Sequence, residues 1–194
     1  KFKSQSILPT HASRVVMYAG AVEAEYGFDT LLKAFMELEM KDVELHIYGD
    51  GKFIKQLLAY QEQDVRIKYM GVVSNEEIIK AEQQATLLVN PRLSNQELVK
   101  YSFPSKTTEY MLSGTPVLTT KLCGIPEEYY PHLYTFDEES VKGFRDKLQE
   151  TLSLASDELQ QKGMAAQRFV LENKSNIKQA QRIEQFFEEI IANK

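Results

Sequence analysis

Residues that could do chemistry gather in one segment, Phe103–Thr120, which reads FPSKTTEYMLSGTPVLTT. A Pro-Ser-Lys turn opens a predicted amphipathic helix that carries Glu109 one turn inside its start and ends at Ser113-Gly114. The start of a helix offers free backbone N–H groups to an anion. A lysine there adds positive charge, and a carboxylate accepts hydrogen bonds from vicinal hydroxyls. This combination suits a ligand with both phosphates and hydroxyls, such as a sugar nucleotide.

The elements that must position this segment follow from the hydrophobic pattern of the chain. Short apolar runs, typical of buried strands, alternate with stretches of helical periodicity. The predicted strands are residues 14–20, 43–48, 65–70, 86–90, 116–119 and 133–136, and the predicted helices are residues 27–39, 53–61, 74–83, 104–113, 140–154, 156–171 and 175–192. Residues 92–102 are polar and irregular, which indicates a loop. The alternation predicts an α/β fold with a doubly wound, Rossmann-like parallel sheet, whose ligands sit beyond the carboxyl ends of the strands.

Two loops at that edge carry further candidate residues. Gly20 and Gly27 bracket the first strand–helix loop, where glycine permits a positive φ or a close ligand approach. Arg92 follows Asn90-Pro91 at the end of a strand, where a ligand-facing group belongs. The alternative for Arg92 is a surface ion pair, and the alternative for Ser105 is a capping role at the helix start.

Composition limits the remaining functions. The 194 residues have a net charge of −5, so the chain lacks a broad basic surface and nucleic acid is not an expected partner. Cys123, the single cysteine, excludes an internal disulfide framework and fits a reducing compartment. No apolar stretch approaches the roughly 20 residues of a membrane span. The three histidines lack metal-ligand spacing, so we expect no protein-held metal and no cofactor.

The segment Phe103–Thr120 also resembles a known signature. It is similar to the donor site of group 1 glycosyltransferases, the family 4 enzymes of retaining mechanism and GT-B fold, in members reading Phe-Pro-Ser/Asn-Lys…Glu-Tyr-Met…Ser-Gly-x-Pro-Val. The resemblance extends from about Val15 to the C-terminus. It implies that the chain is the C-terminal, donor-binding half of such an enzyme, which transfers a sugar from a nucleotide diphosphate to an acceptor.

The resemblance implies roles for individual residues. Glu109 matches the glutamate that grips the ribose hydroxyls, and Ser105, Lys106 and Thr107 open the helix that meets the diphosphate. The loop residues expected to line the base and sugar subsites are Val73, Tyr101, Gly124 and Ile125, together with Gly20 at the first loop. We expect Glu109, Lys106 and Arg92 to carry the catalytic role, because they hold the donor and stabilise the leaving diphosphate.

This sequence departs from the family pattern at the phosphate site. The family usually has an Arg directly after the glycine that matches Gly20 and a Lys directly before the one that matches Gly27, but here these positions are Ala21 and Tyr26. One unit-charge pair at about 4 Å is worth about 4 kcal/mol at an effective dielectric of roughly 20. We therefore hypothesise that Arg92 and Lys106, with Lys100 as a further candidate, supply the missing charge.

A second departure concerns the sugar subsite. The family's other glutamate, which in many relatives contacts the transferred sugar, falls at Tyr101, and Glu97 lies four residues upstream of it. A tyrosine can donate a hydrogen bond but carries no formal charge near neutral pH.

The resemblance also implies an organisation and partners. We expect residues 1–172 to form the nucleotide-sugar-binding domain, and residues 173–194 to form a helix that packs on it or on a missing N-terminal domain. The expected partners are that domain, the nucleotide-sugar donor and a glycan or lipid-linked acceptor at the cytoplasmic face of a membrane. The chain alone should bind donor weakly and transfer nothing. Two alternatives stay open, a sugar-nucleotide epimerase of GT-B fold and a degenerate, non-catalytic nucleotide-binding domain.

Overall fold

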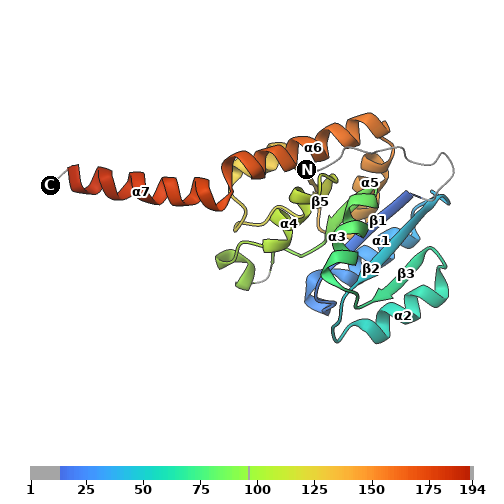
Figure 1. Ribbon diagram of the computed structural model, residues 1–194. Helices are drawn as coiled ribbons and strands as arrows, with labels where there is room; N and C mark the ends of the chain where they lie inside the picture. The colour runs from blue at the N-terminus through green and yellow to red at the C-terminus, as the bar shows by residue number, and fades with distance from the viewer. Residues whose placement is uncertain (1–13, 96, 193–194) are drawn as a thin grey trace.

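The computed structural model describes residues 14–95 and 97–192, which form a six-stranded parallel sheet covered by helices on both faces (Figure 1). The strands are β1 (Arg14–Ala19), β2 (Val43–Tyr48), β3 (Ile67–Gly71), β4 (Leu87–Asn90), β5 (Val117–Thr119) and β6 (Tyr134–Thr135). Their order across the sheet is β3-β2-β1-β4-β5-β6, with every neighbouring pair parallel. This order confirms the predicted doubly wound, Rossmann-like sheet.

The α-helices other than α7 divide between the two faces of the sheet. The α-helices are α1 (Phe28–Met36), α2 (Ile54–Gln63), α3 (Asn75–Gln84), α4 (Ser105–Ser113), α5 (Val141–Leu152), α6 (Ser156–Asn173) and α7 (Asn176–Ala192). One hydrophobic cluster joins the sheet to α1, α2 and α5, and a second joins it to α3, α4 and α6. Strands that are buried on both faces in this way need continuous apolar runs, and all four residues of β4 are buried.

The sheet opens between its two central strands. β1 pairs with β2 over six residues but with β4 only at Val16 and Met17. The chain leaves β1 toward α1 on one face, and it leaves β4 toward α4 on the other face. Such a reversal between neighbouring strands leaves a crevice at their carboxyl ends.

Three short 3₁₀ helices were not predicted: η1 (Ala24–Tyr26), η2 (Glu97–Tyr101) and η3 (Glu127–His132). The prediction of a loop over residues 92–102 is therefore wrong for Glu97–Tyr101. One or two turns of 3₁₀ helix are too short to leave a periodic pattern in a sequence. Its apolar residue Val99 is nevertheless buried in the second cluster.

The helix α7 projects away from the body of the molecule (Figure 1). None of its described residues is buried, although its amphipathic pattern is as clear as that of the packed helices. The exposed apolar side chains are Ile177, Ile183, Phe186, Phe187, Ile190 and Ile191. Whether residues 173–194 pack on this domain or on another one stays a prediction.

Candidate functional site at the carboxyl edge of the sheet

The first strand–helix loop packs directly on the end of β4. Gly27 has a φ of 78°, and a Cβ added to it would lie 2.1 Å from the carbonyl oxygen of Pro91. Only glycine allows both the left-handed backbone and this approach. The loop between β1 and α1 is therefore seated against the segment that carries Arg92.

The start of α4 lies open at the same edge. Its first-turn residue Ser105 is exposed, and its N-cap residue Pro104 has no side chain able to cap it. The amide of Thr107 donates to the Pro104 carbonyl oxygen at 2.9 Å. The first N–H groups of a helix have no acceptor within the helix, so this end can receive an anion.

Lys106 and Glu109 form an ion pair on the face of α4 that borders this opening. The Nζ and Oε2 atoms are 2.9 Å apart, and the side chains are 37% and 51% exposed. A Cβ added to Gly20 would lie 3.4 Å from the Cε atom of Lys106. The lysine therefore reaches from α4 to the end of β1, and both charged groups are accessible to a ligand.

The hydroxyl group of Tyr110 lies behind this ion pair and is fully buried. It accepts from the Ala19 amide at 2.8 Å and donates to the Ala19 carbonyl oxygen at 3.0 Å. Because Gly20 donates its amide to Tyr48 of β2, the polar groups of Ala19 point toward β4, where the ladder has already ended. Burial raises the pKa of Tyr110 well above its usual value, so the hydroxyl remains a donor.

A buried carboxyl group lies near the ion pair. Glu82 of α3 is 5% exposed, and burial raises the pKa of its side chain, which Lys106 lowers and Glu109 raises to a smaller extent. The charges of Lys106 and Glu109 therefore influence the pKa of Glu82 on the neighbouring helix.

Arg92 does not make the surface ion pair considered as its alternative, within residues 14–95 and 97–192. Its Cζ atom lies 4.8 Å from the centroid of the Tyr26 ring, and its Nε atom is buried without a hydrogen-bond partner in the described part of the chain. The side chain of the further candidate Lys100 lies outside the described residues.

Three more buried polar atoms near the carboxyl edge have no partner among the described residues. They are Asn90 Nδ2 at the end of β4, Thr107 Oγ1 in the first turn of α4 and Thr120 Oγ1 just after β5. The Thr120 amide donates to the Asn90 carbonyl oxygen at 3.4 Å, so two of these residues are neighbours across the sheet. Buried polar atoms without partners are rare in folded proteins, and their grouping at this edge is typical of a site that is completed by water or ligand.

The remaining predicted site residues lie at the same edge but differ in accessibility. Tyr101 is 83% exposed at the end of η2, and Val73 is half-buried in the loop after β3. Gly124 packs against the Ser102 backbone just ahead of α4, where a Cβ would meet the Ser102 carbonyl oxygen at 2.1 Å. The side chain of Ile125 is buried, and its amide donates to the Leu122 carbonyl oxygen at 2.9 Å.

The structure thus pairs Lys106 with Glu109, places the Lys106 side chain next to Gly20, and brings Arg92 beside the same loop. The sequence did not predict the hydrogen bonds of Tyr110 to Ala19 or the stacking of Tyr26 on Arg92. A helical tyrosine in an apolar environment usually has a hydrogen-bond partner, and this was the available signal for Tyr110.

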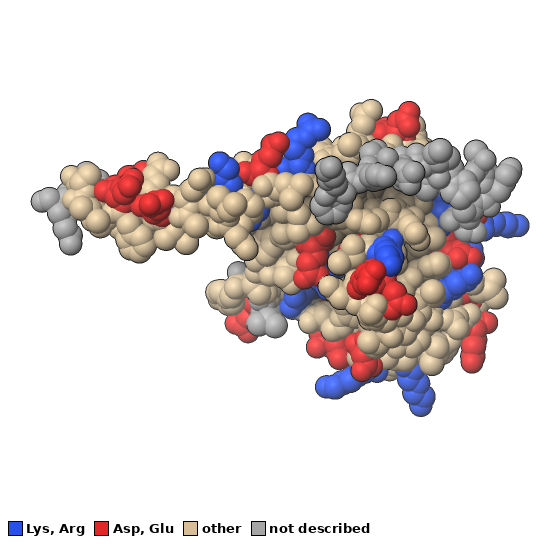
Figure 2. Space-filling view, in the orientation of Figure 1, with Lys and Arg blue, Asp and Glu red and all other residues tan. Residues whose placement is uncertain are grey.

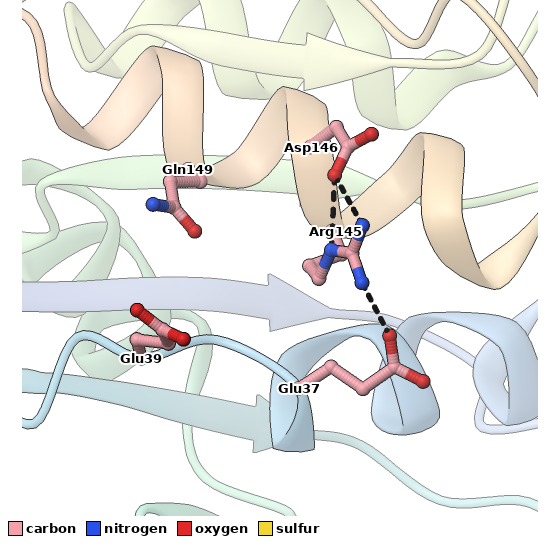
Figure 3. Close-up of a pocket in the computed structure, with 5 residues that line it drawn as sticks. All are labelled: Glu37, Glu39, Arg145, Asp146 and Gln149. Atoms are coloured by element: carbon pink, nitrogen blue, oxygen red, sulfur yellow. Dashed lines mark hydrogen bonds and ion pairs between the residues drawn. The ribbon is translucent and has the colours of Figure 1, made fainter.

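A surface hollow of about 380 Å³ lies elsewhere (Figure 3). Its lining residues are Glu37, Glu39, Arg145, Asp146 and Gln149. They come from the end of α1, the loop into β2, and α5, so the hollow lies toward the amino ends of the strands. Arg145 is already paired with Asp146 and Glu37 at 2.7 and 3.0 Å. Ligands of such sheets bind at the opposite edge, so we do not place the site here.

The described residues form neither a metal-binding cluster nor a membrane-spanning helix. No group of three or more His, Cys, Asp or Glu side chains within residues 14–95 and 97–192 is arranged to hold a metal ion. In that same part of the chain, no helix has the length and apolarity of a membrane span.

Comparison with known proteins gives one family and a set of related folds. Residues 13–153 match the family described as Glycosyl transferases group 1, whereas comparison with curated protein sequences gives no significant match. The structure resembles Anabaena Alr3699/HepE in complex with UDP and glucose, with a TM-score of 0.73 and 15% identity, covering 92% of this chain and 49% of that one. The chain thus spans about half the length of that protein.

Two shorter structures are matched over most of their length. One is the C-terminal domain of the group 1 glycosyl transferase LpcC from Francisella tularensis, with a TM-score of 0.67 and 18% identity, covering 84% of this chain and 86% of that one. The other is the catalytic domain of cholesterol-α-glucosyltransferase from Helicobacter pylori, with a TM-score of 0.65 and 17% identity, covering 82% and 98%. Identities this low show a shared fold.

Proposed function

We propose, because this chain belongs to the group 1 glycosyl transferases, that its carboxyl-edge site binds a nucleotide-diphosphate sugar as the donor half of a retaining glycosyltransferase. The observation that carries the proposal is the uncapped start of α4, from which Lys106 reaches the end of β1. An anion held there meets helix N–H groups and a full positive charge.

The geometry supports a division of roles along the donor. The amides of Ser105 and Lys106, the unpartnered hydroxyl group of Thr107 and the side chains of Lys106 and Arg92 would hold the diphosphate and stabilise the charge that develops as it leaves. Glu109, which is half exposed, would accept hydrogen bonds from the ribose hydroxyls.

The loop residues would complete the two ends of the donor site. Val73 would meet the base through its backbone, and Tyr101, Gly124 and Ile125 would line the sugar subsite. The amide of Ile125 is already used in its own turn, so its carbonyl oxygen is the backbone group left for a ligand.

The ion pair between Lys106 and Glu109 keeps both side chains close to these positions before ligand binds. A nucleotide sugar offers a phosphate to the lysine and hydroxyls to the carboxylate, so it can replace the pair with two charge-assisted interactions. The net gain in binding free energy is the contribution of these new contacts minus that of the ion pair. An exposed ion pair contributes only about 0–1 kcal/mol.

The whole protein, in this proposal, transfers a hexose to a glycan or lipid-linked acceptor. An N-terminal domain would supply the acceptor groups, so the chain alone would bind donor and transfer nothing. The proposed location is the cytoplasm, with peripheral contact at the inner membrane face. HepE, similar in fold, has been crystallised with UDP and with UDP-glucose, and this makes a nucleotide sugar the first ligand to test.

The test is titration of this chain with UDP, GDP, ADP and TDP and with their sugars, read by calorimetry and by thermal shift. We expect saturable binding of one nucleotide, weakened about 10- to 100-fold by Lys106→Gln, because a charge-assisted hydrogen bond is lost. Glu109→Gln should lower the affinity for the same nucleotide, and binding should remain saturable. A matched control is Lys80→Gln, which removes an exposed ion pair with Glu76 on α3.

Absence of saturable binding by any of these compounds would refute the donor site and favour a degenerate domain. The open alternative of an epimerase is tested separately on the full-length protein. Product analysis with and without acceptor distinguishes a transferred sugar from an epimerised nucleotide sugar.

A further inference from the structure

The aromatic ring of Tyr26 lies beside Arg92, a site cation on the loop that follows β4. Tyr26 ends η1, is half-buried and packs against the first hydrophobic cluster. The next residue, Gly27, is pressed on Pro91. The ring and the guanidinium of Arg92 are therefore held together from both sides of the crevice, with 4.8 Å between the Arg92 Cζ atom and the ring centroid.

This contact leaves the N–H groups of Arg92 able to donate hydrogen bonds to another group. A guanidinium that lies over a ring is held by its face, and its five N–H donors point outward in the plane. Lys106, by contrast, is neutralised by Glu109 in the same structure. The buried Nε atom of Arg92 lacks a partner among the described residues, so at least one donor is still to be satisfied.

Tyr18 is an electrostatic neighbour of Arg92 and also lies beside the start of α4. Burial raises the pKa of Tyr18, and Tyr26 and Arg92 are the charged or ionisable neighbours that also act on it. The Oη atom of Tyr18 lies 2.9 Å from the place of a Cβ on Gly20, and the Cε atom of Lys106 lies 3.4 Å from the same place. Tyr18 and Lys106 therefore meet at the end of β1, and Arg92 lies over Tyr26 in the loop that follows this strand.

We propose that Tyr26 is a positioning residue, which stacks the guanidinium of Arg92 so that it faces a diphosphate bound at the start of α4. This inference rests on the proposed donor site and adds the reason why an arginine on a loop can serve it. Without the ring, Arg92 samples many rotamers and must lose that freedom each time ligand binds.

The test is a double-mutant cycle on the affinity of this chain for UDP, or for whichever of GDP, ADP and TDP binds wild type more tightly. Tyr26→Met keeps the bulk of the side chain but removes the ring, and Tyr26→Phe keeps the ring. We expect Tyr26→Met to weaken binding about three- to thirty-fold and Tyr26→Phe to leave it near wild type. In the Arg92→Gln background, Tyr26→Met should have no further effect.

A matched control is Tyr134→Met. Tyr134 is also half-buried against the first cluster, and its ring lies under a different cation, Lys162 Nζ, at 5.2 Å. This variant should bind nucleotide as wild type does. An equal loss from Tyr26→Met with and without Arg92, or no loss at all, overturns the inference.

A measurement on the unmutated chain covers the case in which Tyr26→Met does not fold. The NMR signal of the Arg92 Nε–H group should shift when the nucleotide is added, and the absence of a shift at saturation overturns the inference while the donor site stands. If wild type binds none of the four nucleotides, the donor site and this inference fall together.

Discussion

Tyr110 determines, at the scale of single residues, how the central strands end. Its hydroxyl group takes both backbone groups of Ala19, at 2.8 and 3.0 Å, where pairing with β4 has stopped. We expect Tyr110→Phe to lower the free energy of unfolding by about 1–3 kcal/mol, because a buried N–H and a buried C=O lose their partner. Urea unfolding measures this.

The matched control for Tyr110→Phe is Tyr69→Phe. Tyr69 also donates to a backbone carbonyl oxygen, that of Gly49 at 2.9 Å, but its side chain is only half-buried. Its loss should cost less, because water can reach the carbonyl oxygen. A Tyr110→Phe chain as stable as wild type would contradict the role assigned to the hydroxyl.

Glu82 gives a prediction with a defined pH dependence. Burial raises its pKa in the folded state, so the fold favours the protonated carboxyl. Its contribution is therefore most favourable below the ordinary Glu pKa and is lost as pH rises through the higher folded value. We expect Glu82→Gln to raise the midpoint of thermal unfolding at pH 7 and to have little effect near pH 4.

The comparison of Glu82→Gln with wild type is made as a pH series of thermal unfolding curves. Exposed Glu76 on the same helix is the control position, and Glu76→Gln should show no such rise at pH 7. A wild-type chain that is more stable than Glu82→Gln at pH 7 would contradict the prediction.

The types of the residues in the sequence predicted the start of α4, but they did not predict the contacts between distant loops. A helix start that could bind an anion is indicated by Pro104, Lys106 and Glu109, because these residue types have preferred positions in helices. The stacking of Arg92 on Tyr26 depends on how two loops meet across the sheet, although these residues are 66 positions apart in the sequence, and no local pattern encodes that. The binding roles of the predicted site residues stay predictions.

Arg66 illustrates what holds neighbouring elements together. Just before β3, it donates to the carbonyl oxygens of Leu38 and Met40 at 2.9 and 2.7 Å and pairs with Asp64 at 2.7 Å. It therefore closes the connection between α1 and β2. The Arg66 and Asp64 side chains are only 17% and 13% exposed.

We expect Arg66→Met to destabilise the chain by roughly 3–5 kcal/mol, because it leaves a mostly buried carboxylate without its partner. Hydrogen bonds from Arg66 lower the pKa of Asp64. This stabilisation is present above the ordinary Asp pKa and is lost as pH falls through the lower folded value. Urea unfolding at pH 7 and at acid pH measures both effects.

Arg145→Met is the control for Arg66→Met. It removes an arginine whose pair with Asp146 is open to solvent, so little change is expected. If the two substitutions cost the same, the burial of the Arg66 pair is not what stabilises this connection.

The sequence predicted long elements well and their ends less well. The strand at residues 43–48 was predicted with its observed bounds, because β2 alternates clearly and stops at glycine. The strand predicted at residues 65–70 begins two residues later, at Ile67. Val65 is 83% exposed, and the Arg66 side chain reaches back to the end of α1. The β-branched, apolar Val65 therefore does not belong to the strand, although its residue type favours one.

At the scale of the whole molecule, α7 stands apart from the body. Figure 2 shows that much of its surface is neither acidic nor basic. We expect a chain that ends after Lys174 to unfold within about 2 °C of the full chain, because α7 contributes no buried described residue. Differential scanning calorimetry tests this.

A chain that ends after Ser153 is the control for that truncation. It also lacks α6, whose buried residues include Leu159, Ala166 and Val170, and it should not fold cooperatively. A large fall in stability from loss of α7 alone would show that this helix docks on the domain in solution.

The short ladder between β1 and β4 has a consequence for how such a protein can change over generations. Because the Tyr110 hydroxyl group bonds both backbone groups of Ala19, the fold itself fixes the separation of β1 from β4 at this edge. Substitutions on the surrounding loops can then alter which ligand binds without disturbing the arrangement of β1 and β4.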